Sequence, residues 1–401
     1  MQVEIHVLQS FPPANLNRDE NGMPKSTVFG GRPRARISSQ CQKRAVRLHY
    51  REQEDPKVDE SQFAQRSRGW MPELKALLVA KEIPETQAET AAKLALEVLG
   101  AKFEDGKVES KTILFLGKTE IAAIADILVK NWEAVAAGLS EKVPALPKKD
   151  PNLPKVIENA LKDTGKPGDV ALFGRMMASL PTVNVEAAVQ MAHAISVNAL
   201  QQEFDFFTAV DDLSTGDDQG ADHIGETGYN SSTYYRFTTL DTEQLRKNLG
   251  SDDQVSLITQ VFAESFIKAI PTGHQNGFAA HSLPAAVMIV VRNGQPISLV
   301  DAFENPIAPK GGKSLLENAV SKLDSHWAEL CKMYGEKSVV FKGVVTRTQL
   351  SQQLEALKDC EKPSIDELIK DAIEAKAKAE IEAKAKAEIE AKAKAEIKGG
   401  K

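Results

Sequence analysis

The segment KSTVFGGRPRARISSQCQKRAVRLHYR, Lys25 to Arg51, holds eight Lys or Arg side chains and no Asp or Glu. The whole chain is acidic, with a formal net charge of -6 over 401 residues. Removing eight positive charges from a net charge of -6 leaves about -14 on the rest of the chain. The positive charge is therefore local, and a polyanion would meet a patch instead of a uniformly basic surface.

The first half of this segment predicts an extended strand. Pro33 disfavours helical geometry at Arg32, the residue before it. Arg32, Arg34 and Arg36 are spaced by two, so an extended chain places all three side chains on one side.

The second half predicts a helix. Ser39 suits the N-cap position, and Gln42 follows three residues later, which is the spacing of a capping box. Within the helix, Lys43, Arg47 and Arg51 recur every four residues and form one basic stripe.

A phosphate-binding surface is the functional interpretation of this strand and helix. Free backbone N–H groups at Ser38–Cys41 and the helix dipole favour a phosphate. Arg44, beside the basic stripe, and the arginines of the strand can hold neighbouring phosphates. The alternative is a solvated basic face paired with acids elsewhere. The absence of acids from the segment, and the helix start between its two basic halves, favour phosphate binding.

The rest of the chain predicts an α+β fold compatible with a ferredoxin-like sheet. Val3–Leu8 alternates polar and apolar residues and predicts a strand that ends at Pro12 and Pro13. Asp205–Ser232 predicts a long polar loop. Further strands are predicted at Asp169–Met177, Thr233–Leu240, Pro284–Arg292 and Gln295–Phe303, and further helices at Asn184–Val197, Glu243–Ile270 and Lys313–Gly335.

Three parts of the chain differ in texture and predict the domain organisation. Residues 59–165 are dominated by helical patterns and predict a helical insertion into a domain formed by residues 1–58 and 166–365. In the tail, residues 366–401, the sequence IEAKAKAE occurs three times in tandem from Ile373 to Glu396. Each copy is neutral and rich in helix formers, so we expect a solvated helix or a frayed tail without chemistry.

Composition excludes several classes of protein. Three cysteines far apart in sequence form neither a disulfide framework nor a metal pair, which fits a reducing cytoplasm. No run approaches 18 apolar residues and the N-terminus is not typical of a signal peptide, so we expect a cytoplasmic protein without a membrane segment. No stretch completes a phosphate-loop or nucleophile-elbow pattern, and we expect no cofactor.

An acidic cluster gives an alternative function. The predicted loop holds carboxylates and one His that can bind a divalent metal and hydrolyse a phosphodiester, which predicts a metal-dependent ribonuclease. The spacing is not that of an EF-hand, and flexible acidic loops are mostly solvated, so we favour no metal and no catalytic residue. The cluster consists of Asp211, Asp212, Asp217, Asp218, Asp222, His223 and Glu226.

The run LFGRMM, Leu172 to Met177, leaves two interpretations open. Met and Phe on a strand usually belong to the core. A Gly-Arg-Met run at a strand end can instead let the backbone and an apolar wedge approach a nucleic-acid strand.

The N-terminal sequence resembles the CasC family, the backbone subunits of the type I-E CRISPR surveillance complex Cascade. The matching steps include Asn17-Arg18-Asp19, Phe29-Gly30-Gly31 and Arg36-Ile37-Ser38-Ser39-Gln40. The motifs ALFGRM, AHAISV, FFTAVDDL, HIG and YYR follow in the family's order. The resemblance covers roughly Val3 to Tyr334, and the repeated tail is outside it.

The resemblance implies an RNA-recognition-motif-like palm, a helical finger insertion and a long thumb loop at about residues 198–232. It implies a ribonucleoprotein in antiviral defence, in which copies of the protein stack into a helical filament along one CRISPR RNA beside other Cascade subunits. The guide then pairs with target DNA in short segments. The family is not enzymatic, which argues against the ribonuclease alternative. The thumb sequence is more acidic here than the family pattern.

The resemblance also implies roles for individual residues. Lys25, Ser38, Gln40, Lys43, Arg44 and Arg47 match positions lining the guide RNA groove. Met176 matches a wedge beside the guide where it kinks, and Thr208 and Ile224 match thumb positions at the displaced nucleotide. Together with the basic strand, the predicted RNA-binding set is Arg18, Lys25, Arg34, Arg36, Ser38, Ser39, Gln40, Lys43, Arg44, Arg47, Arg175, Met176, Thr208 and Ile224.

Overall fold

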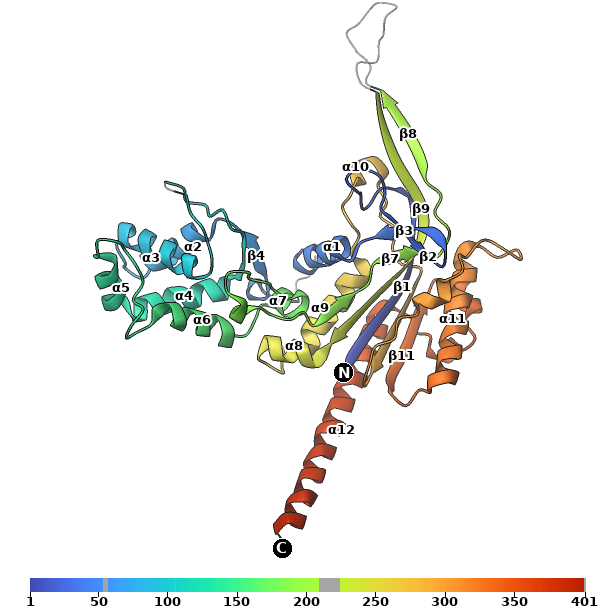
Figure 1. Cartoon of the computed structure of the whole chain (residues 1–401). Coiled ribbons are helices and arrows are strands. Elements are labelled where there is room, and N and C mark those ends of the chain that lie inside the picture. The colour runs from blue at the N-terminus through green and yellow to red at the C-terminus, as the bar shows by residue number, and fades with distance from the viewer. Residues whose placement is uncertain (53–56, 105, 209–223, 400–401) are drawn as a thin grey trace, which may run out of the picture. The chain divides into compact units, whose positions relative to one another are not determined.

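The computed structural model describes residues 1–52, 57–104, 106–208 and 224–399 (Figure 1). The contacts of the chain divide it into two compact units. The sheet unit comprises Met1–Gln53, Gln190–Asp241 and Thr259–Lys401, and the helical unit comprises Glu54–Val189 and Thr242–Ile258. Residues 166–189 and 242–258, which the sequence assigns to the palm, thus group with the helical unit. The palm and finger boundaries remain a prediction.

The sheet unit is built around strands drawn from the whole length of the chain. The strand order is β11-β10-β1-β9-β7-β3-β2, and β6 and β8 also pair with β9. Strand β1 runs antiparallel to both of its neighbours, β9 and β10. The bounds are β1 Gln2–Ala14, β2 Ser26–Phe29, β3 Arg32–Ile37, β6 Val189–Met191, β7 Ala194–Ser196, β8 Glu203–Thr208, β9 Ile224–Asp241, β10 Ala286–Arg292 and β11 Val339–Thr346.

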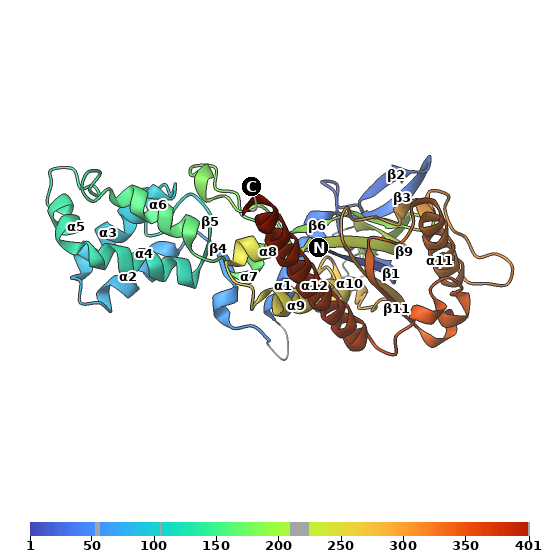
Figure 2. The ribbon, with the colours of Figure 1, turned by 90° about the horizontal axis from the view of Figure 1, so that it is seen from below.

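Helices cover the two faces of this sheet, and the alternation along β9 shows which helix lies on which face (Figures 1 and 2). Tyr235 packs against Phe303, with ring centroids 5.4 Å apart, on the face that α11 covers. The next residue, Arg236, points to the other face, where it donates to the Phe266 carbonyl oxygen at 2.6 Å. The covering elements are α11 Leu315–Tyr334 and the 3-10 helix Val300–Phe303 on the first face, and α1 Ser39–Arg51 and α9 Val255–Lys268 on the second.

The helical unit has its own apolar core. Leu74, Leu96 and Leu128, from three different helices, have at most 1% of their surface exposed. A two-stranded antiparallel sheet, β4 Ala64–Ser67 with β5 Leu114–Gly117, lies in this unit. Its helices are α2 Trp70–Val79, α3 Glu85–Val98, α4 Lys118–Lys130, α5 Trp132–Leu139, α6 Leu153–Asp163, α7 Gly168–Phe173 and α8 Thr242–Leu249.

The α+β class is confirmed, but several local predictions are wrong. Most of the predicted strand Asp169–Met177 is instead the short helix α7, because Pro167 caps its start and Gly174, at φ +76°, ends it. Only Arg175, beyond the helix, makes an isolated antiparallel bridge, to Val185. The predicted helix Asn184–Val197 contributes strands β6 and β7. Pairing with β9, some 40 residues later, overrides the local helical pattern.

Three further boundaries differ from the prediction. Strand β1 continues through Pro12 and Pro13 to Ala14, with a register shift after Phe11 that accommodates the prolines. The predicted helix Glu243–Ile270 is interrupted at Gly250, which has a φ of +68°. Of the predicted strand Gln295–Phe303, the last four residues form a 3-10 helix.

The repeated tail forms one helix, α12 Ile365–Gly399, which extends away from the sheet (Figure 1). Its first turns belong to the core, since Leu368, Ile369 and Ala372 are 0, 2 and 3% exposed. Leu368 fills the space over Gly343 of β11, where a Cβ would lie 2.6 Å from the leucine. Among the residues described, no helix is long and apolar enough to span a membrane. A further short helix, α10 Gln275–Phe278, precedes β10 along the chain.

Candidate nucleic-acid interface

The basic segment folds into a hairpin followed directly by a helix. Strands β2 and β3 pair from Ser26↔Ala35 to Phe29↔Arg32 around a turn at Gly30 and Gly31. Gly30 has a φ of +57°, and a Cβ there would lie 1.8 Å from the Glu304 carbonyl oxygen, so only glycine fits. Strand β3 ends at Ile37 and α1 begins at Ser39, which brings both halves of the segment together as the sequence predicts.

Arg34 does not share the exposure of its neighbours. Its side chain is fully buried, and it donates to the carbonyl oxygens of Ser196 at 2.9 Å, Phe303 at 2.9 Å and Glu304 at 2.8 Å. Burial lowers the pKa of Arg34. Arg34 therefore joins β3 to two distant segments of the sheet unit, and these bonds leave it unsuited to the predicted contact with a phosphate.

The start of α1 is also less open than the sequence predicts. The N-cap is Ser38, one residue earlier, and its hydroxyl accepts from Cys41 N–H at 3.3 Å. Ser38 N–H donates to Asn17 Oδ1 at 2.9 Å, and Ser39 N–H donates to His193 Nδ1 at 3.2 Å. Gln42 makes no capping box and donates to the Ala192 carbonyl oxygen at 2.9 Å. Most donors of the expected phosphate nest are thus bound by the protein itself.

Cations nevertheless dominate the surface around this helix start. The pKa of His193 is lowered, first by partial burial and then by the charges of Arg36 and Lys25. Burial raises the pKa of the Cys41 thiol, while Lys25 and Arg44 oppose that rise. Three cations thus act on these two titratable groups, and Lys25 acts on both, so the helix start lies in a locally positive potential that favours a phosphate.

The predicted residues of the sheet unit differ in exposure. Arg18, Gln40 and Arg44 are exposed, whereas Ser38 and Arg34 are buried. Those that are half-buried, with part of the side chain open to solvent, are Lys25, Arg36, Ser39, Lys43 and Arg47. The surface cations of this set define what we call the basic face: Arg18, Lys25, Arg36, Lys43, Arg44 and Arg47.

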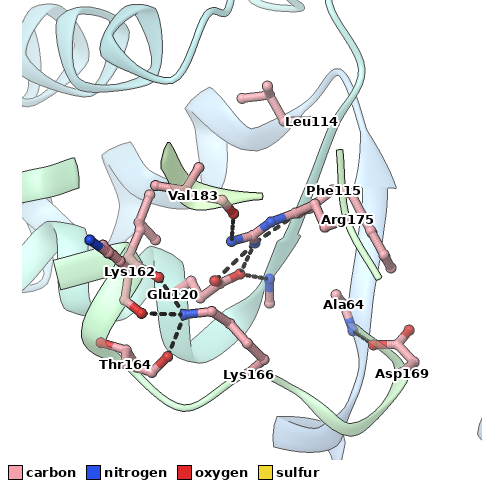
Figure 3. Close-up of polar contacts among 12 residues, drawn as sticks. Ala64, Leu114, Phe115, Glu120, Lys162, Thr164, Lys166, Asp169, Arg175 and Val183 are labelled. Carbon is pink, nitrogen blue, oxygen red and sulfur yellow. Dashed lines mark hydrogen bonds and ion pairs between the residues drawn. The ribbon is translucent and has the colours of Figure 1, made fainter. Parts of the chain in front are cut away.

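Arg175, in the helical unit, is also a structural residue (Figure 3). It forms a fully buried ion pair with Glu120 and donates to both carboxylate oxygens, at 2.9 and 2.7 Å. It donates further to the Phe115 carbonyl oxygen at 3.2 Å. The predicted contact between Arg175 and RNA is therefore not supported.

Met176, the next residue, has the opposite environment. Its side chain is 84% exposed, whereas Arg175 and Met177 on either side are 4% and 5% exposed. An isolated antiparallel bridge between Arg175 and Val185 holds the backbone extended here, so successive side chains point in opposite directions. The buried ion pair thus anchors the backbone directly beside an exposed methionine.

The described parts of the predicted thumb loop form two paired antiparallel strands, β8 and the start of β9. Strand β8 pairs with β9 from Glu203↔Tyr229 to Thr208↔Ile224, so the two predicted thumb residues are cross-strand partners (Figure 1). Phe207 lies over Gly225, whose missing side chain leaves room for the ring. Asp211, Asp212, Asp217, Asp218, Asp222 and His223 of the acidic cluster lie outside the described residues. Within the described ranges, no group of three His, Cys, Asp or Glu residues is placed to hold a metal ion.

The sequence matches the model of the CT1975-like protein family over residues 3–371. The chain belongs to this family. Two solved structures are similar to this CT1975-like protein. One is a chain of a "CRISPR RNA-guided surveillance complex, pre-nicking", with 30% identity and a TM-score of 0.78. The other is a chain of a "CRISPR RNA-guided surveillance complex", with 26% identity and a TM-score of 0.67.

Each comparison covers 94% of this chain and 100% of the solved chain. No curated protein matches it. The family match and the two structures confirm the resemblance to the CasC family of Cascade subunits.

Two residues of the interface escaped the residue-level reasoning. His193 and Asn17 bind the first N–H groups of α1 from 154 and 21 residues away. Neither residue belongs to a periodic pattern or a capping motif that would predict its contact with α1. Both fall inside stretches quoted for the family resemblance, AHAISV and Asn17-Arg18-Asp19, which is the one signal that marks them.

Proposed function

We propose that this CT1975-like protein is the guide RNA-binding backbone subunit of a type I-E Cascade complex in the cytoplasm, without catalysis of its own. Copies of the chain assemble along one CRISPR RNA with other Cascade subunits and present it in short segments for pairing with target DNA. The sheet unit acts as the RNA-recognition-motif-like palm and the helical unit as the finger. Support comes from the family and from the surveillance-complex structures that the chain resembles.

The observation that carries this proposal is the basic face at the junction of β3 and α1. All of its cations except Arg18 come from the acid-free segment Lys25–Arg51 of an acidic chain. After burial, the charges of Arg36 and Lys25 lower the pKa of His193. A guide-bound subunit grips only a few phosphates, while base pairing supplies sequence recognition, so a local patch suffices. An acidic remainder opposes non-specific binding of other nucleic acids.

The proposed contact set leaves out three of the residues predicted from the sequence. Arg34 and Arg175 hold the fold, and the hydroxyl of Ser38 caps α1. The proposed RNA-contact set is therefore Arg18, Lys25, Arg36, Ser39, Gln40, Lys43, Arg44, Arg47, Met176, Thr208 and Ile224.

The test is the salt dependence of RNA binding. The triple variant Lys43→Ala, Arg44→Ala, Arg47→Ala removes about three phosphate contacts from α1. At about 0.7 per single-strand phosphate, the slope of log K against log salt falls by roughly 2, whatever the RNA sequence. Circular dichroism verifies the fold, since Arg47 is half-buried.

A matched control variant loses the same three positive charges from another surface of the protein. Lys322, Lys332 and Lys337 are exposed on α11 and just after it. Their triple replacement by Ala leaves the slope within about 0.7 of the parent protein. Equal slopes for the two triple variants would refute the assignment of the basic face. RNA cleavage with Mg²⁺ or Mn²⁺, abolished by replacing Asp211 and Asp212 with Asn, would refute the non-catalytic role.

A further inference from the structure

We propose that His193 is a further phosphate-binding residue of the basic face and that it takes up a proton when RNA binds. This inference rests on the proposed function, because it adds a titratable residue to the same contact with RNA. His193 directly precedes β7, and β7 pairs with β3 at Ile37↔Ala194. The register therefore places His193 beside Ser38, the N-cap of α1, and its side chain is exposed.

The hydrogen bonds of the His193 ring show where its proton lies. Nδ1 accepts from the N–H of Ser39 at 3.2 Å and lies 3.4 Å from Nη1 of Arg36. A backbone N–H and a guanidinium can only donate, so Nδ1 holds a lone pair, the proton is on Nε2 and the ring is neutral. Both hydrogen bonds of the ring within the described part of the chain are at Nδ1, which leaves the Nε2 N–H available to a ligand.

The charged groups that face this ring oppose its protonation. Strand β3 presents Arg36, and Lys25, next to β2, lies beside it because the Lys25 carbonyl oxygen accepts from Arg36 N–H at 2.9 Å. The first turn of α1 has no acidic residue, and β9 presents the uncharged Phe237, whose carbonyl oxygen accepts from Ala192 N–H. Partial burial, followed by the charges of Arg36 and Lys25, accordingly lowers the pKa of His193.

A bound phosphate reverses this balance. It neutralises Arg36 and Lys25 and brings a negative charge to the ring, so protonation of His193 becomes favourable. The proton comes from the solvent and binds Nδ1, which then gives up both of its hydrogen bonds. The N–H of Ser39 is released in the same step and joins the protonated ring as a donor to phosphate oxygens, at the positive end of the helix dipole. Neutral His193 thus serves as the acceptor at the start of α1 until a phosphate takes that place.

The experiment compares two variants of the full-length protein with the parent protein. In His193→Asn the amide oxygen can accept from Ser39 N–H, as Nδ1 does, but the side chain cannot be protonated. His326→Asn is the matched control, because His326 lies on α11, which covers the other face of the sheet from α1. Fluorescence anisotropy measures the binding of a single-stranded RNA of mixed sequence at about pH 6 and about pH 8, over a range of salt concentrations. Calorimetry at about pH 6, in two buffers of different ionisation enthalpy, counts the protons taken up.

We expect the parent protein to bind RNA more tightly at about pH 6 than at about pH 8 and to take up a proton on binding. Its slope of log K against log salt is steeper by about 0.7 at the lower pH, which is the value of one further single-strand phosphate contact. His193→Asn takes up no proton and has the same slope at both pH values. His326→Asn keeps the proton uptake and the change of slope that the parent protein shows.

Two results would overturn the inference. Binding of RNA by the parent protein without proton uptake, and with equal slopes at both pH values, would mean that His193 only caps α1, and this measurement depends on no variant. A change of slope with pH that persists in His193→Asn would place the proton on another group. Failure of the proposed function has a different signature, since replacing Lys43, Arg44 and Arg47 would then leave the slope intact at about pH 8, where His193 is neutral.

Discussion

Replacing Arg175 by Met tests whether the buried ion pair holds the helical unit together around the exposed Met176. Arg175 makes two bonds to Glu120, at 2.9 and 2.7 Å, and both side chains are completely buried. After the change, Glu120 keeps the N–H of Gly117 at 3.0 Å as a donor and the electrostatic attraction of Lys166, but it loses its ion-pair partner. Breaking one partner of a buried pair costs about 3–5 kcal/mol.

That loss is a large share of the roughly 5–15 kcal/mol by which domains are stable. At 1.4 kcal/mol per factor of ten, it changes the folding equilibrium by about two to more than three orders of magnitude. Urea unfolding, followed by amide hydrogen exchange in peptides from residues 115–185, measures the loss where it arises.

The double variant Arg175→Met, Glu120→Met is the decisive comparison. It removes both charges and keeps apolar volume, and such replacements are commonly neutral or stabilising by about 1–4 kcal/mol. We therefore expect the double variant to be much more stable than Arg175→Met alone. If both variants lost the same free energy of unfolding, the contribution of Arg175 would be packing and backbone hydrogen bonds, and the ion-pair argument would be refuted.

Three other predictions concern the sheet unit. Burial raises the pKa of the Glu4 carboxyl, but the nearby His6 and the hydrogen bond from Arg292 at 2.7 Å outweigh burial and lower the pKa from its ordinary value. The stability from this group is therefore complete above the pKa of the unfolded chain and is lost as pH falls through the lower folded value, so Glu4→Gln should flatten the fall of Tm in acid. Truncation after residue 364 removes the buried Leu368 and Ile369 and should lower the free energy of unfolding in urea by about 3–6 kcal/mol. Truncation after residue 380 keeps both side chains and should leave the free energy of unfolding unchanged. Burial, and after it the charge of Glu336, raises the pKa of the Cys331 thiol to about 11. Alkylation of Cys331 at pH 8 should therefore be on the order of 100-fold slower in the folded than in the urea-unfolded protein, as measured by peptide mass spectrometry.

Sequence patterns predicted the elements whose signals are local. Pro33 and the alternating arginines indicated β3, and the basic stripe indicated α1, because φ restriction and side-chain spacing act within a few residues. The segment Asn184–Val197 was wrongly assigned because its alanine-rich pattern favours a helix. Its backbone instead pairs with β9 at Ile195↔Tyr235, and no local signal carries that partner.

Sequence patterns could not tell which cations of the candidate site are buried, and the reason is physical. Arg34 and Arg44 are both arginines of the same basic segment, so the sequence alone gives no sign of which side chain is buried. Three carbonyl oxygens from residues 196, 303 and 304 surround Arg34, whereas Arg44 stays in solvent with a single long hydrogen bond, 3.5 Å, to Thr272. Carbonyl positions depend on the assembled sheet, so the role of each cation emerges only with the tertiary structure.

This division of roles changes how the eight cations of Lys25–Arg51 should be counted. A phosphate contact releases counterions only where a cation reaches the surface, so the buried Arg34 adds nothing to the salt slope. Its charge still contributes to the field, because its guanidinium is held by neutral carbonyl oxygens and is not cancelled by a carboxylate. Arg34 thus adds to the positive potential at the basic face, while Lys43, Arg44 and Arg47 carry the proposed phosphate contacts, which salt weakens. The number of phosphate contacts that we propose for one copy is therefore smaller than the sequence count suggests. In the proposed filament, the remaining affinity comes from many such copies along one guide.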